Sequence, residues 1–519
     1  MLNKRISLIA AILIGHGISA NADQHPSVPL SAIDWLSDTV AEPVVHKPLK
    51  TPVPIEVAVT NSASVEGITV TTLDGPTPDA VGLLPVSVTG LPRGFWGATS
   101  SVELARLIQV QAPQNLPALQ DLLKMILLAE LDAPLDADGT GALFLARIDK
   151  LLDMGTLDQA QALLERAGPH SPDLFRRWFD VALLTGTEDA ACETLRTNAD
   201  IAPTFSARIF CLARNGDWNA AAVTLETAKV LGYVTAQEDA LIARFLDPEL
   251  FEGEPPLPMP DHVTPLIFRM REAIGEAIPT PTLPRAFANA DLRDITGWKP
   301  QIEAAERLAV TGAIDENHLL GLYTERLPAA SGGVWERVDA VQAFDTAYAA
   351  DDPGAIAKTL PPVWDEMKAA RLEVQFAALY GKGLARLPLA ADTTELAHII
   401  GLLSEDYETV AGKFTPVSAS EKFLVALARG DLSDAVAPTP KAKAILAAFT
   451  QSGMPEQFKP LIDQNMLGEA ILQAIILFSK GVGGDLENAR KALILLRSVG
   501  LEDTARRAAL QLMLLDWRG

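Results

Sequence analysis

The histidines and cysteines that could bind a metal or act in catalysis are few in this chain and widely spaced. One of its seven histidines, His16, lies in an N-terminal apolar segment. The other six stand singly, at His25, His46, His170, His262, His318 and His398. The sequence contains neither a His-Glu-x-x-His motif nor the cysteine and histidine spacing of a zinc site. We therefore expect neither a metal nor another cofactor.

Motifs of nucleophilic and phosphate-binding sites are also missing. The sequence has no Gly-x-Ser-x-Gly elbow, and the Gly-Val-Gly-Gly run at 481–484 lacks the Lys-Ser/Thr pair of a phosphate-binding loop. That run predicts a turn between two helices. Some periplasmic murein-cleaving enzymes carry a helical superhelix, but the Glu-Ser context typical of their catalytic glutamate is absent here. We expect no catalytic residue; an envelope enzyme with an unrecognised site is the alternative.

The only two cysteines, Cys192 and Cys211, lie in consecutive predicted helices. Adjacent antiparallel helices bring Cα atoms within the range of roughly 4.4–6.8 Å that a disulfide requires. An oxidising compartment favours such a bond, whereas two separately buried thiols are the alternative. No Cys-x-x-Cys spacing suggests redox chemistry, so we expect a structural role.

The N-terminus has the three parts of a cleavable signal peptide. Lys4 and Arg5 precede an apolar run at 6–14, and the small residues Ala20 and Ala22 follow. The run has about half of the roughly 20 apolar residues that cross a membrane. We predict cleavage after Ala22, with cleavage after Ala20 as the second choice. No cysteine lies near the cleavage site, so we expect a periplasmic protein that is not a lipoprotein.

The charge balance is strongly acidic. The chain carries 43 Lys and Arg against 66 Asp and Glu, a formal net charge of -23, and loss of the two signal-peptide cations makes it -25. Such a surface repels phosphate backbones and anionic lipid headgroups, so we expect neither nucleic-acid binding nor direct membrane binding. A hydrophobic content of 48% excludes a wholly disordered chain. The abundance of Ala and Leu favours closely packed helices.

Proline content divides the chain into segments. We predict a signal peptide at 1–22, a Pro-rich leader at 23–99, a helical lobe at 100–251, a Pro-rich connector at 252–300 with one helix, and a second helical lobe at 301–519. Runs at 55–59 and 68–73 in the leader alternate as a short β-hairpin would. The leader is either a tether or an arm wrapped on the helical body. An unbroken superhelix is the alternative to two lobes.

Three consecutive segments show the same order of helix, glycine turn and helix. The turn glycines Gly155, Gly186 and Gly216 are 31 and 30 residues apart, and glycine readily adopts the left-handed conformation that ends a helix. The spacing Gly-x-x-x-x-Ala stands at Gly155 to Ala160 and at Gly216 to Ala221. Through this spacing residues 142–247 resemble tetratricopeptide-like (TPR-like) repeats, and residues 480–512 resemble the related Sel1-like repeats. The resemblance implies an all-α solenoid whose concave face binds a peptide or a partner domain.

The densest aromatic region lies in the second half of the chain. Tyr, Trp and Arg dominate binding hot spots, and the candidate partner surface consists of Trp298, Tyr323, Arg326, Trp335 and Arg337. Packing of these aromatics between the two lobes is the alternative. We expect an exported scaffold that mediates protein–protein interaction in a cell-envelope assembly. The alternatives are a murein-acting enzyme or a structural accessory of a secretion or motility machine.

Overall fold

The computed structural model describes residues 33, 35–36, 77–451 and 453–515. These residues form 25 α-helices joined by turns and short 3-10 helices, and no β-strand occurs among them. The predicted all-α class is therefore confirmed. The signal peptide and the predicted β-hairpin lie outside the described residues. None of the described helices is both long and apolar enough to span a membrane.

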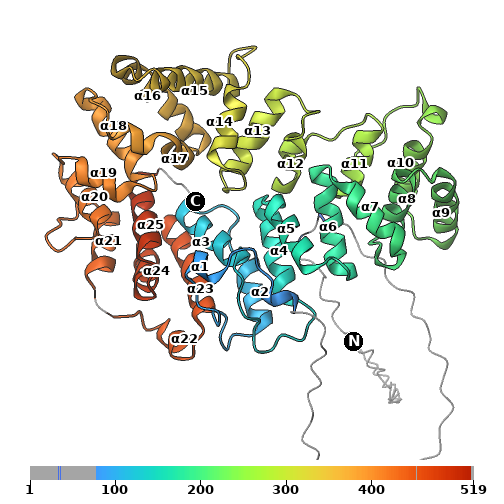
Figure 1. Cartoon of the computed structure of the whole chain (residues 1–519), viewed down its shortest axis with the longest axis horizontal. Coiled ribbons are helices and arrows are strands. Elements are labelled where there is room, and N and C mark those ends of the chain that lie inside the picture. Colours follow the sequence, from blue (N-terminus) through green and yellow to red (C-terminus); the bar gives the residue numbers. More distant parts are fainter. Residues whose placement is uncertain (1–32, 34, 37–76, 452, 516–519) are drawn as a thin grey trace, which may run out of the picture.

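The helices follow one another along the chain with short connections (Figure 1). The first part contains η1 (Pro78–Ala80), α1 (Val86–Thr89), α2 (Ser101–Gln109), α3 (Pro117–Leu128), α4 (Ala142–Met154), α5 (Leu157–Ala167), α6 (Pro172–Thr185), α7 (Glu188–Thr197), η2 (Ala199–Ile201), α8 (Phe205–Arg214), α9 (Trp218–Leu231), α10 (Ala236–Leu246), η3 (Pro248–Phe251) and α11 (Pro265–Ala273). The second part contains η4 (Thr280–Thr282), η5 (Arg285–Phe287), α12 (Ala288–Asp291), α13 (Trp298–Ala309), α14 (Glu316–Thr324), α15 (Val334–Ala349), α16 (Pro353–Ala370), α17 (Glu373–Leu384), α18 (Ala391–Leu402), α19 (Tyr407–Lys413), α20 (Ala419–Arg429), α21 (Pro440–Thr450), α22 (Lys459–Asp463), α23 (Leu467–Val482), α24 (Leu486–Ser498) and α25 (Glu502–Leu514).

The three predicted helix–turn–helix units are present as α4–α5, α6–α7 and α8–α9. Their turn glycines Gly155, Gly186 and Gly216 have φ angles of 82°, 79° and 84°. This left-handed conformation costs glycine little, and it lets the chain reverse within two or three residues. Of the glycine run at 481–484, the first two residues form the end of α23, and the last two lie in the predicted turn before α24.

The start of α2 has only half of the capping box that its sequence predicts. The spacing of Ser100 and Glu103 predicts a reciprocal capping box. The Ser100 hydroxyl does accept a hydrogen bond from the Glu103 amide at 3.3 Å. The Glu103 carboxylate, however, accepts two hydrogen bonds from Arg106, at 2.7 and 2.6 Å, and only half of the box forms. Both halves form at Thr235–Glu238 and at Ser418–Glu421.

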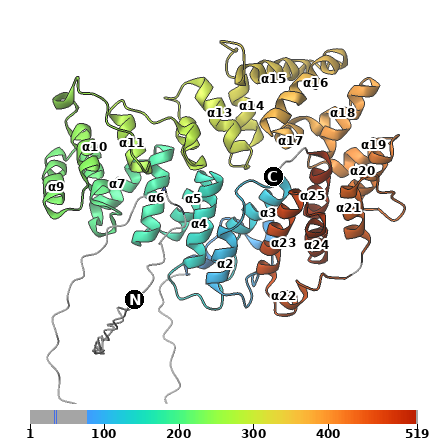
Figure 2. The ribbon, with the colours of Figure 1, turned by 180° about the vertical axis from the view of Figure 1, so that it is seen from behind.

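The chain path closes on itself. Both views show the last helices returning to the first, with α23 beside α2 and α25 beside α3 (Figures 1 and 2). The Gly468 amide donates to the Phe95 carbonyl at 2.8 Å, and the Thr99 hydroxyl donates to Glu469 at 3.0 Å. Further along the seam, the Ala118 amide donates to Gln511 Oε1 at 2.9 Å. The two ends of the helical body are therefore joined by specific polar contacts as well as by apolar packing.

The middle of the chain also packs on its first half. Helices α11 and α12 lie against α6. The Thr311 hydroxyl donates to the Met154 carbonyl at 2.7 Å, and Lys124 Nζ donates to the Gly312 carbonyl at 2.8 Å. One hydrophobic cluster extends through the described helices from residue 35 to residue 515. Helices far apart in sequence therefore share a single core.

The described part of the predicted leader belongs to this core. Trp35 and Leu36 are 7% and 2% exposed, and Phe95 and Trp96 are fully buried at 0% and 1%. The Trp35 and Phe287 rings lie edge to face, with their centroids 5.5 Å apart. At these positions the leader is an arm packed on the body.

Candidate functional site

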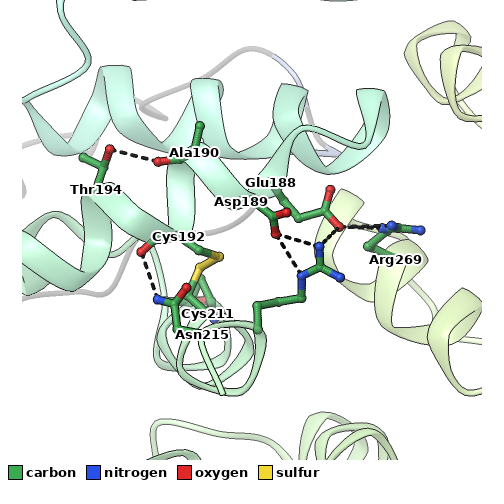
Figure 3. Close-up of a disulfide and its surroundings, with 11 residues drawn as sticks. Glu188, Asp189, Ala190, Cys192, Thr194, Cys211, Asn215 and Arg269 are labelled. Atoms are coloured by element: carbon green, nitrogen blue, oxygen red, sulfur yellow. Dashed lines mark hydrogen bonds and ion pairs between the residues drawn. A yellow bond between two sulfur atoms is a disulfide. The ribbon is translucent and has the colours of Figure 1, made fainter. Parts of the chain in front are cut away.

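A disulfide joins the second and third helical hairpins. Cys192 on α7 and Cys211 on α8 are bonded, with their Cα atoms 4.9 Å apart (Figure 3). Both cysteines are buried, and Asn215 Nδ2 donates to the Cys192 carbonyl at 3.4 Å. The bond is therefore inaccessible to solvent and fixes α8 against α7.

Charged side chains connect this disulfide pair to α11. Glu188 is 1% exposed at the start of α7, and its Oε1 accepts hydrogen bonds from Arg269 at 3.1 and 3.0 Å (Figure 3). Arg269 also pairs with Glu272, which pairs with Arg293 at 2.6 Å. Burial raises the pKa of Glu272, but the guanidinium groups of Arg293 and Arg269 outweigh it, and that pKa lies below its ordinary value. Glu272 therefore stays ionised and holds α11 to the segment that follows α12.

Two arginines hold residues 255–258, in the first part of the connector, against α10 and α11. Arg271 donates from Nη1 to the Leu257 carbonyl at 3.1 Å and to Glu276 at 2.6 Å, and from Nη2 to the Pro258 carbonyl. Arg244 donates to Glu276 at 2.9 Å and to the Pro255 carbonyl at 3.0 Å. Proline residues leave these carbonyls without a helical partner, and the guanidinium groups supply the missing hydrogen bonds.

These elements enclose a cavity of about 470 Å³, which we call the connector pocket. Its volume lies in the range that suits a ligand or an inserted side chain. Its walls are largely apolar and come from α10, the connector and α11: Leu241, Ile242, Leu257, Leu266, Ile267 and Met270. A cavity with such walls binds apolar groups through the removal of their surface from water.

The polar rim of the connector pocket contains the starts of three helices. Thr204, Thr235 and Thr264 line the pocket and are the N-caps of α8, α10 and α11. Each threonine hydroxyl accepts a backbone amide of its own helix, at 3.0, 3.2 and 3.3 Å. The N-termini of three helices therefore lie at the pocket, where they favour the negative end of a backbone carbonyl group. Glu238 and Asp261 also line the pocket and disfavour an anionic ligand.

The predicted partner surface is brought together but is mostly internal. Trp298 is 8% exposed and packs on Trp335, with ring centroids 5.0 Å apart. Tyr323 is 2% exposed and donates to Glu306 at 2.8 Å. Arg337 binds the same carboxylate through two hydrogen bonds at 2.7 and 2.6 Å. These contacts join α13, α14 and α15 to one another, so the aromatics pack neighbouring helices and do not bridge the two predicted lobes.

Only one member of that predicted set is exposed. The Arg326 side chain is 63% exposed and pairs with its neighbour Glu325.

Burial raises the pKa of Tyr323 well above its ordinary value, and the Glu306 carboxylate raises it further. Tyr323 therefore stays neutral and serves as a hydrogen-bond donor. The geometry supports internal packing by four of the five residues and leaves Arg326 as the one available to a partner.

Among the described residues, no three side chains of His, Cys, Asp or Glu form a group that could hold a metal ion. His398 is buried, stacks on Phe414 with 3.5 Å between ring centroids, and has no partner for its Nε2 atom. Burial lowers the pKa of His398 to about 4, so the imidazole is neutral at neutral pH.

Sequence reasoning missed the connector pocket. Its walls come from segments up to 67 residues apart, Thr204 to Arg271, and from a Pro-rich stretch interpreted as a linker. A usable signal was present in the three capping threonines. Thr204, Thr235 and Thr264 follow the same interval of about 30 residues as the turn glycines. Equivalent positions of successive repeats lie on one face of a solenoid.

Comparison of the chain with protein-family models, with curated proteins and with solved structures finds no match.

Proposed function

We propose that the chain is an exported periplasmic scaffold that binds a protein partner of the cell envelope, and that the connector pocket receives an apolar segment of that partner. The single observation that carries the proposal is the combination of apolar walls with three helix N-termini at the rim. An extended peptide has both complementary features, because it offers an apolar side chain and backbone carbonyls a few ångströms apart.

The surrounding contacts support a preformed site. The disulfide fixes α8, and Arg244 and Arg271 fix the connector that forms the opposite wall. A binding surface that is already ordered loses less conformational entropy when its partner binds. The helical hairpins with their 30-residue interval support a TPR-like solenoid, in which neighbouring repeats build such a surface.

The acidic charge supports a protein partner over nucleic acid. The net charge of -25 expected for the mature chain disfavours phosphate backbones, and the connector pocket offers a partner apolar contacts instead. Export rests on the signal-peptide pattern at 1–22, and mass spectrometry of the periplasmic protein tests it directly. A mature N-terminus at Asp23 is the expected result.

Site-specific crosslinking in the envelope tests the binding site. A photo-activated amino acid replaces Gln237, which is exposed and lines the connector pocket. The same amino acid at the exposed Asp365 on α16 is the control. One dominant crosslinked protein from the first position only is expected.

A pocket-filling variant shows whether the cavity itself binds the partner. Ala240→Trp fills the connector pocket, whereas Ala190→Trp places the same bulk on the exposed face of α7. We expect Ala240→Trp to abolish the crosslink and Ala190→Trp to preserve it. Equal crosslinking from Gln237 and Asp365, or an unchanged crosslink in Ala240→Trp, would refute the proposed site.

A further inference from the structure

The leader residues near the predicted cleavage site occupy a defined place on the helical body. Ile33 and Leu36 form a tight turn, in which the Leu36 amide donates to the Ile33 carbonyl at 3.4 Å. Trp35 and Leu36 are buried, and Ile33 is partly buried against the same hydrophobic cluster. A stretch of only four residues therefore places three apolar side chains on the body.

The receiving surface lies where three parts of the chain meet. The Trp35 ring contacts Phe287 of η5, which in turn contacts Phe268 of α11 with centroids 5.4 Å apart. A cavity of about 490 Å³ beside the indole is also lined by α4, by connector residues 261–263 and by Leu283. We call this receiving surface the leader slot. Its walls come from α2, α4, the connector and η5, all of which follow Leu36 by more than 60 residues.

The leader slot has the character of a recognition site. An indole ring buries a large apolar area with few rotatable bonds, which is why tryptophan is favoured at binding hot spots. The charged side chains around it are satisfied by the body itself. Lys150, for example, is 4% exposed and donates to the Gln109 and Gln111 carbonyls at 3.0 and 2.8 Å. The lining of the slot therefore combines apolar side chains such as Val263 and Leu283 with charged side chains such as Lys150, whose hydrogen bonds are made within the body.

We propose that the leader slot is a docking site for an aromatic–aliphatic pair, and that Trp35 and Leu36 of the same chain are its resident occupant. Trp35 and Leu36 lie on the body through buried apolar contacts. A separate peptide with the same side chains can make the same contacts. The leader slot adjoins the connector pocket, and the two share Asp261 and His262. Its occupant and its test do not depend on the scaffold function proposed above.

Peptide binding to the full mature chain tests the proposal. The double variant Trp35→Ala/Leu36→Ala empties the leader slot, and a labelled peptide with the sequence of residues 30–38 is the probe, followed by fluorescence anisotropy. We expect the double variant to bind the peptide at least about tenfold more tightly than the wild type, whose slot is occupied. A peptide with alanine in place of the tryptophan should bind neither protein.

Two further variants separate slot binding from nonspecific adhesion. Leu283→Asp in the double-variant background places a charge at the edge of the slot and should abolish peptide binding. Ile295→Ala, at a residue 74% exposed and absent from the slot lining, should leave it unchanged. Circular dichroism confirms that each variant is folded.

Equal peptide affinity for wild type and double variant would overturn the proposal, as would no binding to a folded double variant. Analytical ultracentrifugation checks the origin of the occupant. A monomeric wild type agrees with docking within one chain, whereas a dimer that dissociates in the double variant would overturn that assignment and place a second copy's leader in the slot.

Discussion

Closure of the helical body predicts a sharp difference between two glycines. Gly97 has φ of 55°, and a Cβ atom at this position would lie 1.6 Å from the Asn465 carbonyl oxygen. Gly90 has φ of 68°, but a Cβ atom there meets nothing within 4 Å. Both Gly97→Ala and Gly90→Ala impose left-handed backbone strain, whereas only Gly97→Ala pushes the first and last parts of the chain apart.

The difference in free energy follows from the contacts at the seam. Left-handed strain costs alanine about 1–2 kcal/mol in either variant. Relief of the overlap at Gly97 also displaces the Gly468–Phe95 and Thr99–Glu469 hydrogen bonds, each contributing about 1 kcal/mol. Looser packing of Phe95 and Trp96 on Gly468 adds roughly 1–3 kcal/mol. We expect Gly97→Ala to destabilise closure by about 3–5 kcal/mol more than Gly90→Ala.

Small-angle scattering and hydrogen exchange measure this effect. Gly97→Ala should increase the radius of gyration and speed amide exchange in α2 and α23, while Gly90→Ala leaves both near wild type. Unchanged scattering and exchange in a folded Gly97→Ala protein would show that the two ends do not meet as described, and the closed path would then be wrong.

Three other perturbations have expected outcomes. Burial lowers the pKa of His398 to about 4, from 6.5 in the unfolded chain. Between these two pH values the unfolded state binds more protons than the folded state, so stability decreases as the pH is lowered through this window. Between about pH 7.5 and about pH 5 the wild type should lose about 2 kcal/mol of folding stability. Urea midpoints should show a smaller loss for His398→Phe and the full loss for the control His318→Gln, at an exposed residue. An equal loss of stability in both variants would refute the assignment. Replacing Cys192 and Cys211 by alanine, 19 positions apart, should destabilise the α7–α8 pair by about 3 kcal/mol, and unchanged resistance to limited proteolysis would contradict this. Glu306→Gln leaves Arg337 without its buried carboxylate and should cost roughly 3 kcal/mol in thermal or urea unfolding, whereas an unchanged midpoint would mean that the pair does not stabilise the fold.

The sequence alone determined the local features of this protein. Helical periodicity and the turn glycines predicted the hairpins α4–α5, α6–α7 and α8–α9, because helix formation and termination depend on residues within a few positions. The same hairpin order placed Cys192 and Cys211 in adjacent helices and left a disulfide and two buried thiols as alternatives. The bond itself is a feature of the tertiary structure. The signal-peptide pattern, and the periplasmic address drawn from it, likewise remain predictions from short-range sequence.

Tertiary structure alone decided which distant residues meet. The composition of the aromatic region around Trp298 and Tyr323 predicted a binding surface. In the structure both side chains are buried, and Tyr323 donates a hydrogen bond to Glu306. The connector pocket and the leader slot each combine segments that composition assigned to linkers. Return of α23 and α25 to α2 and α3 has no counterpart in local pattern, because it depends on complementary shapes hundreds of residues apart. The sequence of an amphipathic helix determines which of its faces is buried. The rest of the fold determines which other helix that face packs against.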